Sequence, residues 1–278
     1  MKVTTKGVGV IESRLPGPIL TIMAGVHGNE VCGLKAIEQI EKELPSQIKQ
    51  GRVYLIRANL KAIELNVRQT DMNLNRAFRL DNLLTEGEKA SYERTRALEL
   101  MSFLDESVAL LDIHSSTSKV SKVFAICEPR SYHVAKLLPV EIISNGWDIL
   151  EPGGTDYYMS QKEKVGICVE CGYHLDPLAP ERATNSILTF LSRFGIVESH
   201  SQSVQEVKRF VHAYHIHHTE TNFMPSREFA DFEALSEGEL IGNDGEKPVY
   251  APKNTCIIFC RKRDEPGEEA FILGTEDK

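Results

Sequence analysis

The sequence predicts an α/β protein in which helices flank a mixed central sheet, followed by a small C-terminal all-β domain. Through the first 200 residues, apolar β-rich runs alternate with segments whose apolar residues recur at helical spacing. Past Gly195 the segments become short and strand-like, and Gly, Pro, Asn and Asp separate them. Because 278 residues suit one large and one small domain, we assign 1–200 to the α/β domain and 201–278 to the β domain.

The α/β part begins with a strand, a loop and a helix. The run ILTIMAGV at 19–26 is continuously apolar, which is typical of a strand covered on both faces. Apolar residues at helical spacing then predict a helix over 31–44, which Pro45 ends. The capping box TEGE at 85–88 starts a second predicted helix, over 86–104. The other predicted elements are strands at 52–58, 108–113, 122–127, 141–144 and 166–170 and a helix over about 180–194.

The C-terminal part of the chain reads as a set of short strands. A polar stretch at 199–206 is suited to a linker between the two domains. Strand-like segments follow at 207–215, 239–241, 255–259 and 270–273. Their spacing and the turn residues between them predict a small all-β unit.

Composition and charge exclude several classes of protein. The formal net charge is −8, from 32 Lys and Arg against 40 Asp and Glu, and no basic run could follow a phosphate backbone, so nucleic acid is not an expected partner. The amino terminus lacks a signal-peptide core and the apolar runs are strand-sized, which predicts a cytoplasmic protein without membrane association. The six cysteines are expected to be reduced thiols. A homo-oligomer is compatible with the sequence.

Polar groups that could do chemistry follow three of the predicted strands. His27 and Glu30 come directly after the first apolar run, His114 ends the strand VALLDI, and Glu170 lies in the apolar frame GICVEC. In open α/β sheets, functional groups gather beyond the carboxyl ends of the strands. Two histidines and one glutamate form a recurrent zinc-ligand set that leaves a position open for water. Glu170 would then be available as a general base.

A plain structural role competes with this interpretation. A lone histidine at a strand end is more often a hydrogen-bonded polar residue than a metal ligand, and H-x-x-E arises often by chance. The coincidence of polar groups at several strand ends is what favours a metal site. Asp112 shares a strand face with His114, so it is either an acid that supports this ligand or an ordinary strand-end acid.

The segment RQTDMNLNRAF at 68–78 concentrates arginine, asparagine and aspartate between a predicted strand and a predicted helix. One interpretation is a solvated loop. The other is a binding loop, because a guanidinium beside an amide is a natural clamp for a carboxylate. A second arginine near a metal could also polarise a substrate carbonyl.

Four motifs follow one another along the chain: HGNE at 27–30, DMNLNRAF at 71–78, DIHSS at 112–116 and VECG at 169–172. Together they resemble the succinylglutamate desuccinylase/aspartoacylase family, relatives of the zinc carboxypeptidases. Two C-terminal segments resemble the β-domain of that family, LSEGELIG at 235–242 and GEEAFILG at 267–274. The resemblance covers most of the chain and implies a zinc carboxypeptidase-like fold for the α/β domain.

The resemblance implies a role for each matching polar residue at the strand ends. His27, Glu30 and His114 would bind one zinc ion per chain. Glu170 would serve as general base and proton shuttle. These roles agree with the chemistry inferred above from the residue types alone.

The resemblance also implies roles in the loop at 68–78. Asn75 with Arg76 would grip the carboxylate of the substrate, and Arg68 would stabilise the developing oxyanion. Two features depart from the family pattern. Arg79 follows the phenylalanine where many relatives place a proline and a glycine, and no counterpart of the tyrosine and arginine that finish the acyl pocket of aspartoacylase is evident. The tyrosines at 157–158 lie nearby in sequence, with a structural role as the alternative.

Two other clusters favour structural roles. Cys168 and Cys171 form a C-x-x-C pair inside an apolar strand, whose geometry sends the two thiols to opposite faces. We therefore expect core packing rather than redox chemistry. The cluster HIHH at 215–218 is expected to lie at a domain surface, not to bind a second metal.

The sequence and the resemblance together predict a zinc-dependent hydrolase of linear amides, which removes the acyl group from an N-acyl amino acid or a related small carboxylate. A metal-activated water would be the nucleophile and Glu170 the general base. A zinc carboxypeptidase-like peptidase is the alternative within the same chemistry. A catalytically silent zinc-containing module that binds a ligand is the alternative of a different class, and the buried carboxylate of Glu170 speaks against it because desolvating an idle carboxylate is costly.

Overall fold

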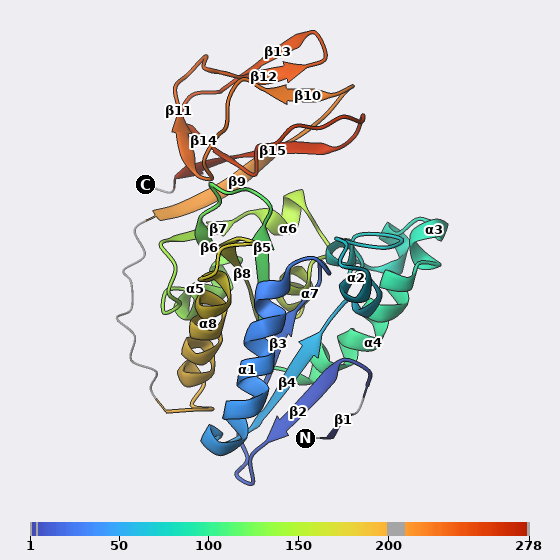
Figure 1. Ribbon diagram of the computed structural model, residues 1–278, viewed down its shortest axis with the longest axis vertical. Helices are drawn as coiled ribbons and strands as arrows, with labels where there is room; N and C mark the ends of the chain where they lie inside the picture. Colours follow the sequence, from blue (N-terminus) through green and yellow to red (C-terminus); the bar gives the residue numbers. More distant parts are fainter. Residues whose placement is uncertain (1, 4, 199–208, 277–278) are drawn as a thin grey trace.

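The computed structural model describes residues 2–3, 5–198 and 209–276, and its backbone forms one long mixed sheet with helices on both faces (Figure 1). From edge to edge, the strands are β1 (Lys2–Val3), β2 (Val8–Glu12), β4 (Arg52–Arg57), β3 (Ile19–Ala24), β5 (Ala109–Ser116), β8 (Val165–Tyr173), β6 (Val123–Ile126), β7 (Ile142–Asn145), β9 (Arg209–His218), β15 (Glu269–Glu276), β14 (Thr255–Ile258) and β11 (Glu233–Leu235). The predicted fold class is confirmed.

The centre of this sheet consists of parallel strands. β4, β3, β5 and β8 run in the same direction, and β6 pairs with β8 in the opposite one, so the sheet is mixed. Each of these strands was predicted within a few residues from its apolar run. The carboxyl ends of the four parallel strands therefore meet at one edge, which is where the chemistry is expected.

Helices cover both faces of the sheet. On one face, α1 (Val31–Gln47) and α8 (Ala179–Arg193) pack together over a large apolar core (Figure 1). On the other face, α4 (Tyr92–Glu106) and α7 (Thr155–Gln161) enclose a second core. Apolar residues on alternate sides of the strands supply both cores, as expected for strands covered on two faces.

Two predicted helix boundaries were wrong. α1 continues to Gln47, because Pro45 lies in its last turn, where the Ile48 amide still donates to the carbonyl of Leu44. The helix predicted over 86–104 is interrupted. The capping box opens only the short helix α3 (Glu86–Lys89), and the Ser91 side chain then caps α4 by accepting a bond from the Arg94 amide.

Several short helices were not predicted, because four to seven residues are too few to establish a helical period. They are α2 (Leu60–Leu65), α5 (Tyr132–Ala135), α6 (Trp147–Leu150) and α7. No helix in the described part of the chain is both long enough and apolar enough to cross a bilayer. All six cysteines are free thiols.

The C-terminal strands both extend the central sheet and form a sheet of their own. β9 pairs with β7 in parallel and with β15 antiparallel, so β9, β15, β14 and β11 continue the large sheet. A separate antiparallel sheet contains β10 (Phe223–Pro225), β12 (Leu240–Asp244) and β13 (Lys247–Tyr250). These strands lie at one end of the molecule (Figure 1). The small all-β unit is thus confirmed, but its continuity with the central sheet was not foreseen, since pairing between distant strands leaves no local signal.

The predicted linker at 199–206 and the predicted domain boundary between residues 200 and 201 lie outside the described residues. The division into units 1–200 and 201–278 therefore stays a prediction.

Candidate metal centre and substrate pocket

The central parallel strands bring three predicted site residues to one edge of the sheet. His27 follows β3 by three residues, and His114 lies near the carboxyl end of the adjacent strand β5. Glu170 lies on β8 directly across from His114 in the strand register. Because side chains alternate along a strand, register neighbours share a face, and both residues line the same pocket.

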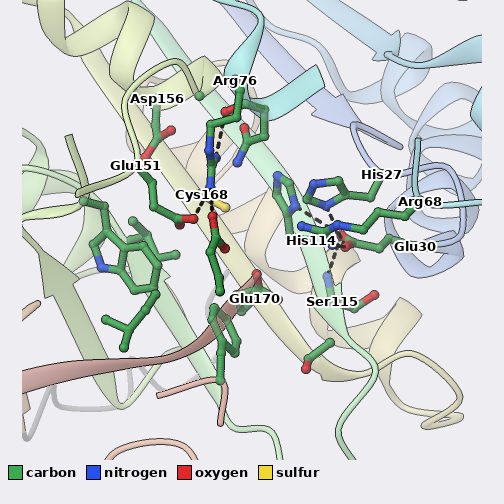
Figure 2. A pocket seen from close by; sticks show the side chains of 18 of the residues that line it. His27, Glu30, Arg68, Arg76, His114, Ser115, Glu151, Asp156, Cys168 and Glu170 are labelled. Atoms are coloured by element: carbon green, nitrogen blue, oxygen red, sulfur yellow. Dashed lines mark hydrogen bonds and ion pairs between the residues drawn. The ribbon is translucent and has the colours of Figure 1, made fainter. Parts of the chain in front are cut away.

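His27, Glu30 and His114 surround one point. Nδ1 of His27 lies 2.7 Å from Oε1 of Glu30, and Nδ1 of His114 lies 3.1 Å from Oε2 of Glu30. The three offer ligand atoms that all lie within 4.8 Å of one another, and all three side chains are buried. Among the described residues, no other group of at least three His, Cys, Asp or Glu meets this condition. Figure 2 shows the three side chains converging.

Further polar groups lie beside the outer nitrogen of each imidazole. Nε2 of His27 lies 3.1 Å from Oδ1 of Asn73, and Nε2 of His114 lies 3.2 Å from Oδ2 of Asp112. The Thr155 hydroxyl donates to the same Asp112 oxygen at 2.6 Å. Of the two roles left open for Asp112, the geometry favours support of His114, since such carboxylates orient a ligating imidazole and raise its basicity.

The electrostatics of His27 and Glu30 suit a cation. Burial lowers the pKa of His27 to about 4, although the Glu30 carboxylate opposes this shift, so its imidazole is neutral near pH 7. Burial on its own would raise the pKa of Glu30, but the two histidines more than offset it and hold that pKa well below its usual value. Burial would lower the pKa of His114, but Cys168, Asp112 and Glu30 raise it well above its usual value, so a metal would have to displace a proton from this imidazole. A neutral imidazole and an ionised carboxylate are the forms that bind a metal. This donor set therefore fits a zinc ion.

Gly28 fixes the loop that carries the first two candidate ligands. A Cβ atom at this position would lie 2.0 Å from the backbone carbon of Ala62 in α2. We expect Gly28→Ala to force the loop away from α2 and to lower the free energy of unfolding by about 3 kcal/mol. Urea denaturation measures the loss. Gly87→Ala is the matched control, because a Cβ at Gly87 meets nothing within 4 Å. Equal stability of the two variants would contradict the tight contact.

Glu170 is a buried acid whose second oxygen has no partner. Its side chain is 8% exposed, and Oε2 makes no hydrogen bond. Burial, followed by the negative charge of Glu30, raises the pKa of Glu170 to about 8. An unpaired oxygen on a carboxyl group with a raised pKa is suited to accepting and returning a proton.

The loop at 68–78 is held in place by a buried acid that sequence reasoning missed. The Glu93 carboxylate accepts bonds from the amides of Thr70, Asp71 and Met72. Glu93 is fully buried in α4, where its neighbours in sequence suggested an ordinary helix. The loop is therefore an ordered part of the pocket rather than a solvated segment.

The three predicted functional residues of this loop all line the pocket, but their side chains differ in their interactions. Nη1 of Arg68 lies 3.6 Å from Oε1 of Glu30, beside the candidate ligands. Oδ1 of Asn75 is buried without a partner. The Arg76 guanidinium is already engaged, in an ion pair with Glu151 and at 3.5 Å from Glu269 (Figure 2).

The far wall of the pocket consists of residues that belong to no motif recognised in the sequence. α6, the segment that follows it and α7 contribute Trp147, Asp148, Glu151 and Asp156. The C-terminal region contributes Phe259, Arg261, Glu269, Phe271 and Ile272. Sequence analysis missed them because they lie on short helices and on a distant hairpin. The pocket is thus assembled from both parts of the chain.

Three further predictions about side chains can be compared with the structure. Tyr157 lines the pocket, whereas the Tyr158 hydroxyl donates to Asp105 outside it. Cys168 and Cys171 belong to different apolar clusters, which confirms that they lie on opposite faces of β8. In the cluster at 215–218, His217 stacks on Phe271 and lies 3.0 Å from an Asp244 oxygen.

Asp156 creates a pH-dependent cost to folding. Burial, with the nearby charge of Asp148, raises its pKa from 3.8 to about 7. Below its unfolded-state pKa, such a carboxyl group is protonated in both states and does not change the free energy of unfolding. As the pH rises toward the folded-state pKa, the group lowers the free energy of unfolding increasingly, because it ionises in the unfolded chain but not in the folded protein. We expect Asp156→Asn to increase the free energy of unfolding at pH 8 by at most on the order of 4 kcal/mol, and to raise the melting temperature accordingly. Both gains should become progressively smaller as the pH falls toward 4.

Melting curves of the two proteins between pH 4 and pH 8 test this expectation. Asp105→Asn serves as a control of opposite sign. Burial would raise the pKa of Asp105, but Lys162 and Tyr158 hold it below its usual value, so the control should be less stable than the parent near neutral pH. A gain for Asp156→Asn that is the same at pH 4 and pH 8 would contradict the assigned ionisation.

Comparison with known proteins identifies the family of this chain. The model of the succinylglutamate desuccinylase/aspartoacylase catalytic domain matches residues 16–191. The chain is 29% identical over 167 residues to a probable aspartoacylase of Prochlorococcus marinus, strain MIT 9313, covering 57% of this chain and 54% of the relative. It is 26% identical over 196 residues to an N-acyl-aromatic-L-amino acid amidohydrolase (carboxylate-forming) of Xenopus tropicalis, covering 63% of each protein. The matched part thus spans less than two thirds of each of these relatives.

The fold is shared with solved structures over nearly the whole chain. The X-ray structure of a succinylglutamate desuccinylase from Vibrio parahaemolyticus superimposes with a TM-score of 0.77 at 20% identity, covering 98% of this chain and 86% of that one. At this identity the similarity shows the fold alone. The family model, which matches more than half of the chain, carries the assignment. The chain is therefore a member of the succinylglutamate desuccinylase/aspartoacylase family.

Proposed function

We propose that this protein is a zinc-dependent deacylase, which hydrolyses the amide bond of an N-acyl amino acid or a related small carboxylate. The observation that carries the proposal is the meeting of His27, Glu30 and His114 around one point, with the unpaired oxygen of Glu170 in the same pocket. Membership of a family of amide hydrolases supports it.

His27, Glu30 and His114 would hold the metal, and Asp112 and Asn73 would orient the two imidazoles. When bound, zinc supplies Lewis acidity that lowers the pKa of water and polarises a carbonyl group. Three protein ligands leave a coordination position for water or substrate, as in catalytic zinc sites.

The other pocket residues would handle the proton and the substrate. Glu170 would take a proton on Oε2 from the attacking water and return it to the nitrogen of the leaving amine. Arg68 would donate hydrogen bonds to the oxyanion that forms at the acyl carbon. Asn75 and Arg76, both in the pocket, would contact the bound substrate.

The architecture of the pocket favours a short substrate over a peptide. Phe259, Phe271 and Ile272 from the C-terminal region form part of its wall. A peptide chain would have to pass this wall, whereas an acylated amino acid is short enough to fit within the pocket. The proposal therefore ranks a deacylase above a carboxypeptidase-like enzyme.

A substrate panel with the purified, zinc-loaded protein tests the proposal. The panel contains N-acylated aspartate, glutamate and aromatic amino acids, together with short peptides that have a free carboxyl terminus. We expect hydrolysis of at least one acyl amino acid, loss of that activity on chelation, and its return with zinc. Cleavage of the peptides alone would support the peptidase. No cleavage by a protein that holds zinc would support a silent binding module.

A further inference from the structure

Asp231 is a buried acid of the C-terminal region that connects two segments beside the pocket. It lies shortly before β11, is 3% exposed and does not itself line the pocket. Its Oδ1 accepts a hydrogen bond from the Phe259 amide at 2.8 Å. Its Oδ2 accepts one from the Ser121 hydroxyl at 2.8 Å, and the carboxylate also accepts one from the Lys122 amide. One side chain thus ties the end of β14 to the loop between β5, which carries His114, and β6.

Phe259 lines the pocket in a backbone conformation that phenylalanine rarely adopts. Its φ is 54°, in the left-handed region, and among the described non-glycine residues with positive φ it is the one that lines the pocket. Such a conformation is strained and persists only where the surrounding structure holds it. The Asp231 carboxylate is a direct restraint of this kind, because it binds the amide of Phe259 itself.

The ring of Phe259 packs against aromatic side chains of the α/β part. Its centroid lies 6.0 Å from that of Trp147 and 5.8 Å from that of Phe124, at distances usual for aromatic pairs. Trp147 also lines the pocket, and its indole is held by a hydrogen bond of 2.8 Å to the Ser144 hydroxyl. Because this neighbour is fixed, the room left in this part of the pocket depends on where the backbone at Phe259 directs the ring.

We propose that Asp231 is a positioning residue, which holds the Phe259 ring in the pocket wall, and that this ring limits the length of the substrate that the pocket accepts. The inference rests on the proposed deacylase function. It assigns the selection of short substrates to one side chain and its restraint rather than to the wall as a whole. Because Asp231 does not line the pocket, it would act only through the residues that it holds.

The test measures how activity falls as the substrate lengthens. Two series start from the acyl amino acid that the zinc-loaded parent hydrolyses best. One series lengthens the acyl chain and the other the side chain of the amino acid, until the kcat/KM of the parent has fallen about 100-fold. The size penalty of a series is the kcat/KM of its first member divided by that of its last. The variants are Phe259→Gly, Asp231→Asn and the double variant.

Phe259→Gly removes the ring without adding strain, because glycine adopts a positive φ readily. We expect the size penalty to fall at least about tenfold in one series, while kcat for the first member changes less than about twofold. Asp231→Asn should lower the penalty of the same series by about three- to tenfold, since an amide has one oxygen to accept the bonds that the carboxylate receives on two. In the double variant, Asp231→Asn should add nothing further, because the ring that it positions is absent.

Asp244→Asn is the matched control. Asp244 is also a buried acid of the C-terminal region, at 4% exposed, and it accepts hydrogen bonds from the amides of Glu220 and Thr221. None of these three residues lines the pocket. We expect its size penalties to stay within about twofold of those of the parent, whatever its effect on stability. Thermal melting and zinc content verify that each variant is folded and loaded.

The outcomes separate this inference from the proposed function. If the parent hydrolyses acyl amino acids but shows no size penalty, or if Phe259→Gly leaves both penalties unchanged, the inference is wrong and the deacylase proposal stands. An Asp231→Asn effect that is equally large with and without the ring would contradict the positioning role. If the parent hydrolyses no acyl amino acid, both proposals are overturned.

Discussion

Replacement of Glu170 by Gln is expected to reduce kcat by about 10³-fold or more while zinc remains bound. The substitution keeps the shape of the side chain and removes its capacity to accept a proton. Oε2 of Glu170 has no hydrogen-bond partner, and none of the proposed metal ligands depends on it. The loss should therefore appear in the chemical step and not in the metal content. Steady-state kinetics and elemental analysis of the purified variant measure the two quantities.

Asp148→Asn is a suitable control for this experiment. Asp148 is another acid of the pocket, and burial raises its pKa to about 6, so the same kind of substitution is made in a comparable environment. We expect less than a tenfold change in kcat, because Asp148 has no part in the proposed proton transfer. Zinc lost from Glu170→Gln would indicate that Glu170 is a ligand. Activity within tenfold of the parent would mean that another group serves as the base.

The parts of the fold that were predictable from sequence are those with a strong local signal. Continuous apolar runs identified β3, β4, β5 and β8, because strands covered on both faces need no polar side. The interruption before α4 was not predicted, since the Ser91 cap competes with a helical pattern that continues through it. The pairing of β7 with β9 joins segments more than 60 residues apart, and neither segment specifies the other.

The candidate site also has a part that could be predicted from the sequence and a part that could not. The candidate ligands could be predicted because each follows or ends an apolar strand, and the parallel sheet brings those ends together. The partners of Arg76 could not be predicted. Glu151 follows a helix of four residues and Glu269 lies 193 residues away along the chain, yet both face the same guanidinium.

Removal of the metal is expected to abolish activity and to lower the melting temperature, and zinc should restore both. A ligand that binds only the folded state stabilises it by about 4 kcal/mol at a thousandfold excess over its Kd. For a protein of this size that corresponds to a rise of roughly 10 °C. Differential scanning calorimetry of the chelated protein, with and without added zinc, measures the shift.

Variants of Glu30 and Asp112 distinguish a metal ligand from a residue that supports a ligand. Glu30 is 3% exposed and contacts both histidines. Glu30→Gln replaces its carboxylate at the centre of the cluster by an amide. This variant should lose the zinc-dependent shift in melting temperature entirely. Of the three candidate ligands, Asp112 lies beside only His114, at its outer nitrogen, so Asp112→Asn should keep the shift but require about 10- to 100-fold more zinc. A parent protein that melts at the same temperature with and without zinc, or that stays active after chelation, would exclude the metal centre. If the parent and Asp112→Asn require the same zinc concentration, the assignment of the three ligands stands and only the supporting role of Asp112 is contradicted.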